Sequence, residues 1–92
     1  MPNFPNPFNP ETWIPFTLGE EAEVRLSVYA ADGSLVRKID LGRLTPGFYT
    51  DRRRAAYWDG RNALGEPVAS GAYFVIFQAG SVTQTRRLLL MK

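Results

Sequence analysis

The sequence contains no cysteine and no histidine. Thiol chemistry, disulfide bonds, imidazole general bases and most zinc sites are therefore excluded together. It also lacks a long hydrophobic run, because the longest unbroken apolar stretch is residues 72–77. A membrane-spanning helix needs ~20 apolar residues, so no membrane-spanning segment is expected.

The composition that remains is that of a folded domain. Hydrophobic residues make up 45% and charged residues 22% of the 92-residue chain, which argues against disorder and for a single domain. With no disulfide available, stability must come from aromatic and aliphatic core positions. The lack of cysteine suits a reducing cytoplasm and a secreted bacterial domain alike.

The charges are unevenly distributed along the chain. Lys and Arg number 11 against 9 Asp and Glu, for a net charge of +2, and every base follows residue 23. The basic clusters lie at residues 52–54 and 86–87. A nucleic-acid-binding face usually has a denser basic surface with interleaved aromatics. We therefore interpret these arginines as solvated strand faces and edge protection, and expect no nucleic-acid partner.

One hairpin is predicted directly by the side-chain pattern. Residues 22–30 alternate apolar and polar side chains, the period of a strand with one buried face. Asp32 and Gly33 then supply a tight turn, because glycine accepts a positive φ. The partner strand is expected at residues 35–41, and the pattern leaves its inward face ambiguous.

Further short strands follow from composition and from turn residues. Residues 12–18 are strand-like, but Pro15 predicts an edge strand with a break or a bulge. Residues 48–58 form either a bulged strand or a loop followed by a short strand. Residues 72–79 are apolar on both faces, as expected of a central strand, and residues 82–91 form the last strand.

These segments together predict an all-β antiparallel sandwich of about seven strands. The Pro-rich residues 1–10 are expected to be a linker or an extended N-terminal segment. Residues 11–92 are expected to form the sandwich domain.

The most informative local string begins at Trp58. We expect Trp58 to end a strand as a core residue and Asp59 to accept backbone N–H groups in the turn that it opens. Gly60 and Gly65 provide left-handed backbone positions. The structural signature comprises Trp58, Asp59, Gly60, Gly65, Gly71 and Tyr73.

Four ordered motifs resemble the flagellar hook-capping-type Ig-like domain and related C-terminal modules of exported bacterial proteins, including type IX secretion sorting domains. They are NPFNPET at 6–12, the VY, DG and VR pairs within 28–37, WDGRN at 58–62 continued by SGAYF at 70–74, and TRRL at 85–88. The resemblance implies an Ig-like or fibronectin III-like sandwich within a larger secreted, cell-surface or periplasmic protein. Residues 48–57 are longer and more basic than the strand that this family has before its Trp-Asp-Gly.

No residue set points to catalysis or to a metal. Calcium takes about six to eight oxygen ligands, whereas the loop offers only the acidic side chains of Asp59 and Glu66. We therefore interpret Asp59 and Asn62 as turn caps rather than as a cation site. Glu20, Glu21 and Glu23 are typical of a solvated turn rather than of acid–base chemistry. We expect no enzyme activity, no cofactor and no metal.

The predicted role is sorting, anchoring or binding of a protein partner or of a neighbouring domain of the parent chain. If alternate residues of the strand at 72–79 face the core, Phe74 and Ile76 face outward. They then form an apolar stripe for a partner, or the N-terminal segment covers them through Phe4 or Phe8. The alternative role is a structural capping module of the hook type.

Basic side chains add to this candidate surface. They are Arg86 and Arg87 on the last strand, and Arg52, Arg53 and Arg54 beside Tyr57. A flat patch of Tyr57 and arginines can bind a glycan or an anionic surface. A carbohydrate-binding accessory role is therefore a further alternative.

Overall fold

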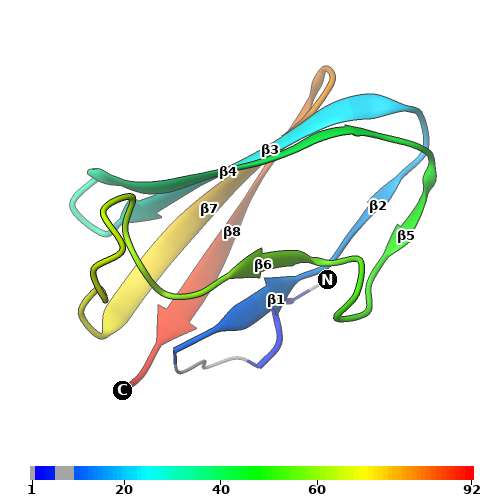
Figure 1. Cartoon of the computed structure of the whole chain (residues 1–92). Coiled ribbons are helices and arrows are strands. Elements are labelled where there is room, and N and C mark those ends of the chain that lie inside the picture. Colours follow the sequence, from blue (N-terminus) through cyan, green and yellow to red (C-terminus); the bar gives the residue numbers. More distant parts are fainter. Residues whose placement is uncertain (1, 6–9) are drawn as a thin grey trace.

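The computed structural model describes residues 2–5 and 10–92, and these residues form eight β-strands (Figure 1). The strands are β1 (Thr12–Ile14), β2 (Phe16–Leu18), β3 (Ala22–Ala30), β4 (Leu35–Leu44), β5 (Gly47–Tyr49), β6 (Ala56–Trp58), β7 (Gly71–Ala79) and β8 (Val82–Leu90). Every strand pairing is antiparallel. The predicted all-β fold is confirmed. Within the described residues, no helix is long and apolar enough to cross a membrane.

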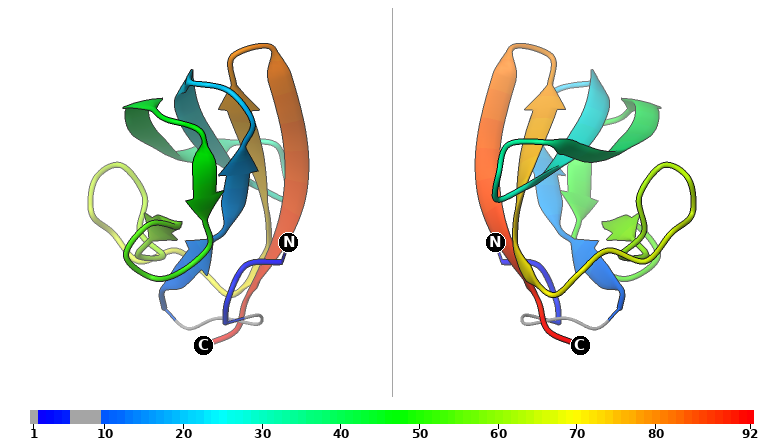
Figure 2. Two further views of the ribbon diagram at one scale, coloured as in Figure 1. Left: turned by 90° about the vertical axis from the view of Figure 1, so that its right-hand side faces the viewer. Right: turned by 90° about the vertical axis from the view of Figure 1, so that its left-hand side faces the viewer.

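The strands build two layers. One layer is a four-stranded sheet in the order β4-β3-β7-β8, and the other consists of the two-stranded ribbons β1-β6 and β2-β5. Figures 1 and 2 show both ribbons facing the same side of the four-stranded sheet. This arrangement is the expected Ig-like β-sandwich.

The core lies between the layers and follows from strand alternation. In β3, Val24, Leu26 and Val28 are at most 1% exposed, and the residues between them are exposed or half-buried. The facing ribbons contribute the other large buried side chains. The buried hydrophobic residues are Ile14, Phe16, Leu18, Val24, Leu26, Val28, Tyr49, Ala56, Trp58, Tyr73, Val75, Phe77, Ala79, Leu88 and Leu90.

Pro15 divides the first predicted strand into two, as expected. β1 pairs with β6, whereas β2 pairs with β5. Proline has no N–H to donate, so the ladder is interrupted at this residue. Neither interpretation of residues 48–58 describes the whole segment. The loop and the short strand β6 are present, with a turn at residues 51–54, but residues 48 and 49 belong to strand β5.

Two bulges explain why the inward face of β4 is ambiguous in sequence. The register against β3 shifts between Val24 and Arg25 and again between Val28 and Tyr29. Each extra residue reverses the alternation. As a result, most apolar residues of β4 pack against the core, but Leu35 is 49% exposed. β4 also continues to Leu44, beyond the predicted end at residue 41.

The described N-terminal residues pack along β1. Phe4 and Trp13 exchange two backbone hydrogen bonds of 2.9 and 2.8 Å. Asn3 is only 4% exposed, and its Nδ2 donates to Thr12 Oγ1 at 2.9 Å. The Phe4 ring stacks on Trp13 with ring centroids 6.2 Å apart. Phe8 and most of the opening motif lie outside the described residues.

Candidate functional site

The signature residues Trp58 and Tyr73 meet in the core. Trp58 is 1% exposed and Tyr73 is 6% exposed, and their rings pack edge to face with centroids 5.5 Å apart. The Tyr73 hydroxyl donates to the carbonyl of Ala69, and burial raises the pKa of Tyr73. Gly71 is the first residue of β7. These residues hold the layers together and do not form an open surface.

The loop after β6 is fixed by hydrogen bonds to its own backbone. Trp58 Nε1 donates to the Arg61 carbonyl at 2.9 Å, and Asp59 Oδ1 accepts the Arg61 N–H at 3.0 Å. The Arg61 guanidinium donates to the Gly65 carbonyl at 2.8 Å. Gly60 and Gly65 both have positive φ. Asp59 is therefore placed as a turn cap.

Asn62 organises the tip of this loop as a turn cap. Its Oδ1 accepts the N–H groups of Leu64 and Glu66, both at 3.0 Å. Its Nδ2 donates to the Glu66 carboxylate at 3.1 Å. Leu64 is left 84% exposed at the tip. An asparagine among turn residues is a general turn signal, but its partners cannot be read from spacing.

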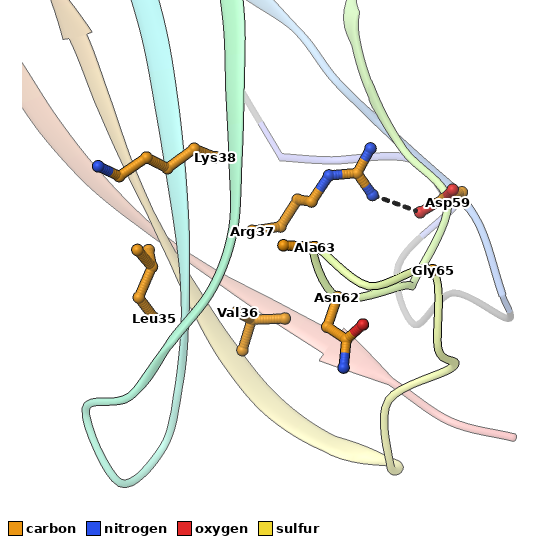
Figure 3. A pocket seen from close by; sticks show the side chains of 8 residues that line it. All are labelled: Leu35, Val36, Arg37, Lys38, Asp59, Asn62, Ala63 and Gly65. Carbon is orange, nitrogen blue, oxygen red and sulfur yellow. Dashed lines mark hydrogen bonds and ion pairs between the residues drawn. The ribbon is translucent and has the colours of Figure 1, made fainter.

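An ion pair between Arg37 and Asp59 joins the loop to the edge strand β4. Their closest atoms, Nη1 and Oδ1, lie 3.2 Å apart, and the N–H of Ala63 donates to the Val36 carbonyl at 3.2 Å. Figure 3 shows the Arg37 guanidinium pointing at Asp59 beside a pocket of ≈ 530 Å³ between β4 and the loop. Arg37 is thus committed to a structural contact. Both residues belong to recognised motifs, but their pairing was not predicted.

The acidic residues are spread over several elements. Within residues 2–5 and 10–92, no group of three or more Asp or Glu side chains is close enough to hold a metal ion. Glu21 pairs with Arg43, and Arg25 lies 3.8 Å from Asp40.

The arginine triplet does not act as one patch. The Arg52 guanidinium carbon lies 4.6 Å from the centroid of the Trp13 ring, whereas that of Arg54 lies 4.7 Å from the Tyr49 ring. Arg53 lies between them with an exposed side chain. Cation–π contacts of this kind stabilise the exposed turn between β5 and β6.

Tyr57 joins an aromatic cluster on the outer side of the β1-β6 ribbon. Its ring centroid lies 5.4 Å from that of Trp13, its register partner, and Trp13 also contacts Phe4 and Arg52. The Tyr57 hydroxyl donates to Glu11 Oε2 at 2.6 Å. The Trp13 ring therefore already contacts three side chains, and the cluster ties the N-terminal residues to β6.

The hydrogen bond to Glu11, with a smaller contribution from burial, raises the pKa of Tyr57 to about 12. A raised pKa in the folded state means that protonated Tyr57 stabilises the fold. This contribution is complete below the usual tyrosine pKa of about 10 and is lost as the pH rises through about 12. We expect Glu11→Gln to lower the pH at which Tyr57 loses half of its protons. NMR of the Tyr57 ring as a function of pH measures this midpoint.

Glu21→Gln is the matched control, because the Glu21 carboxylate pairs with Arg43 instead. It should leave the Tyr57 midpoint unchanged. An unaltered midpoint in Glu11→Gln would show that the Glu11 contact does not hold the Tyr57 proton in solution.

The outer face of the four-stranded sheet carries an apolar stripe. Phe74 is 37% exposed and Ile76 is half-buried, while the alternate residues of β7 face the core. Across the sheet, Phe74 lies between Tyr29 on β3 and Arg87 on β8. Phe4 stacks on Trp13 and not on this stripe.

Arg86 and Arg87 lie on opposite faces of β8. Arg86 shares the inward face with its register partner Val75, and its guanidinium donates to the carbonyl of Pro15 in the other layer. Burial lowers the pKa of Arg86. Arg87 is exposed on the outer face beside Phe74. The outer surface predicted from sequence is therefore carried here by Phe74, Ile76 and Arg87.

Comparison with known proteins identifies similar domains. The chain matches the family model of the FlgD Ig-like domain over residues 11–82. No curated protein matches the chain in sequence.

Two solved structures are similar in fold. FlgD from P. aeruginosa has a TM-score of 0.66 at 23% identity, with 84% of this chain and 57% of that chain covered. Dimeric latent PorU from Porphyromonas gingivalis has a TM-score of 0.70 at 16% identity, with 98% of this chain and 9% of that chain covered. The chain thus spans just over half of one relative and a small part of the other.

Proposed function

The chain belongs to the FlgD Ig-like domain family, and we propose that it is an interaction module of a larger secreted, cell-surface or periplasmic protein. In this proposal the sandwich does no chemistry. It presents a protein-binding surface that sorts or anchors the parent chain. Trp58 and Tyr73 lie in the core, and Asp59, Gly60 and Gly65 shape the loop after β6, so we assign binding to the outer faces of the sandwich.

One observation carries the proposal, the exposure of Phe74 on the outer face of the central strand β7. Phe74 is 37% exposed, and its cross-strand neighbours are Tyr29 and Arg87. Aromatic residues and arginine are enriched at protein–protein interfaces. An apolar centre beside an exposed cation is therefore suited to a protein partner or to a neighbouring domain.

The share of the relatives that the chain covers supports a role within a larger protein. The similar part is 9% of PorU and 57% of FlgD. The likeness to FlgD favours a second candidate, a structural module that spaces or caps an assembly. In that case the same fold would work without a sorting partner.

We would test sorting by fusing residues 2–92 to a passenger protein and following its export in the native host. The fusion is expected to be exported and retained, and Phe74→Ser is expected to abolish retention without unfolding the module. Leu64→Ser is the matched control, because Leu64 is an exposed apolar residue on a loop. Equal export of the passenger without the module would contradict sorting and favour the capping role.

A further inference from the structure

The two edges of the four-stranded sheet differ in how they are protected. β4 carries two bulges, and its residue Val36 accepts a hydrogen bond from the N–H of Ala63 in the loop. Bulges and covering loops are common ways of blocking an edge strand. β8 pairs with β7 over its whole length, from Val82 to Leu90, without a register shift. Within the described residues no strand pairs with its other side.

The regular edge of β8 offers unpaired backbone groups. In an antiparallel ladder, alternate residues turn their N–H and C=O groups away from the neighbouring strand. The β7–β8 hairpin has a two-residue turn, so Ala79 and Val82, which close it, form a hydrogen-bonded pair. Every second residue of β8 after Val82 is then hydrogen-bonded to β7, and the residues between them are not. By this alternation Thr83, Thr85 and Arg87 direct their backbone groups outward. Such an edge is a template for an added strand.

A groove lies beside this edge, at the seam between β8 and β2. Its volume is ≈ 520 Å³, and Val82, Gln84 and Arg86 of β8 form one wall. Phe16 and Leu18 of β2 belong to the opposite side. A strand added to β8 would point alternate side chains toward this groove, whose lining is mixed and whose apolar part includes Phe16, Phe77 and Val82.

The charges favour a particular partner. Residues 67–92 contain three bases, Arg86, Arg87 and Lys92, and no Asp or Glu. Arg87 faces outward, whereas Glu20 and Glu21 line the far side of the groove. Arg86 lines the same groove and Glu21 is paired with Arg43, so the groove favours neither sign of charge, whereas Arg87 attracts acidic side chains on the outer face. The geometry selects apolar side chains inward and an acidic side chain outward, beside Arg87.

We propose that β8 takes up an extended acidic segment of a partner protein as an additional strand. Backbone hydrogen bonds hold the segment along the β8 edge, its apolar side chains enter the groove against β2, and its acidic side chains pair with Arg87. This inference rests on the proposed function, because it names the partner chemistry of the same interaction module.

The probe is a capped synthetic peptide of alternating valine and glutamate, studied by amide hydrogen exchange in the intact 92-residue chain. At saturation we expect exchange at Thr83, Thr85 and Arg87 to slow by about tenfold or more, since these amides become hydrogen-bonded. Arg87→Gln should weaken peptide binding about fivefold or more. A peptide with lysine in place of glutamate should not protect these amides.

Thr85→Pro should abolish the protection of the β8 amides by the peptide, because proline removes an outward N–H. Thermal melting of this variant first establishes that it folds. Arg87→Gln keeps the backbone and remains informative if the proline variant unfolds. Absence of protection, or equal protection by the lysine peptide, would overturn the proposal. Without peptide, slower amide exchange at higher protein concentration would also overturn the proposal. It would show that β8 pairs with a second copy of the chain. If the peptide fails while Phe74→Ser still abolishes retention, only the proposed edge partner is wrong and the interaction module stands.

Discussion

Replacing Trp58 with alanine should lower the free energy of unfolding by about 3–5 kcal/mol, the usual effect of removing a large buried ring. Trp58 is 1% exposed and packs on Tyr73, so its truncation leaves a cavity between the layers. The substitution also removes the Nε1 hydrogen bond to the Arg61 carbonyl. A small domain has a total stability of only about 5–15 kcal/mol, so much of the variant should unfold. Chemical denaturation followed by circular dichroism measures the change.

Tyr57→Ala is the control for this experiment. Tyr57 precedes Trp58 in the same strand, but it faces outward and is 44% exposed. Its replacement should cost about 1 kcal/mol, because it removes the ring contact with Trp13 and the hydrogen bond to Glu11. A loss below about 1 kcal/mol for Trp58→Ala would mean that the indole is not a core residue.

The strands could be predicted from the sequence because their signals are local. The alternation of residues 22–30 places β3 with its observed ends, and Pro15 marks the break between β1 and β2. The turn residues Asp32 and Gly33 do connect β3 to β4. In each case a residue within a few positions of the feature determines it, through strand periodicity or through backbone restriction.

The contacts that close the sandwich could not be predicted, because they depend on how the layers stack. Arg37 pairs with Asp59 across 22 residues, and Arg86 reaches Pro15 across 71 residues. A run of arginines shows charge but not which ring each guanidinium will cover. That is why Arg52 and Arg54, treated as one patch in sequence, lie on different aromatic residues.

Replacing Gly60 with alanine should destabilise the domain by about 3 kcal/mol or more, because steric overlap adds to backbone strain. Gly60 has a φ of +75°, which an L-residue rarely adopts. An added Cβ would lie 2.2 Å from the carbonyl oxygen of Pro10. That atom belongs to the backbone and cannot rotate away as a flexible side chain would. Thermal and chemical unfolding of the variant give the size of the effect.

Gly65→Ala separates backbone strain from steric overlap, because this substitution introduces only the backbone strain. Gly65 has a similar φ of +82°, but no atom lies within 4 Å of an added Cβ. Its replacement should cost only about 1–2 kcal/mol, the strain of a left-handed alanine. The excess loss in Gly60→Ala therefore measures the contact between Pro10 and the loop after β6. Equal losses in the two variants would mean that the backbone at Pro10 does not pack against Gly60 in solution.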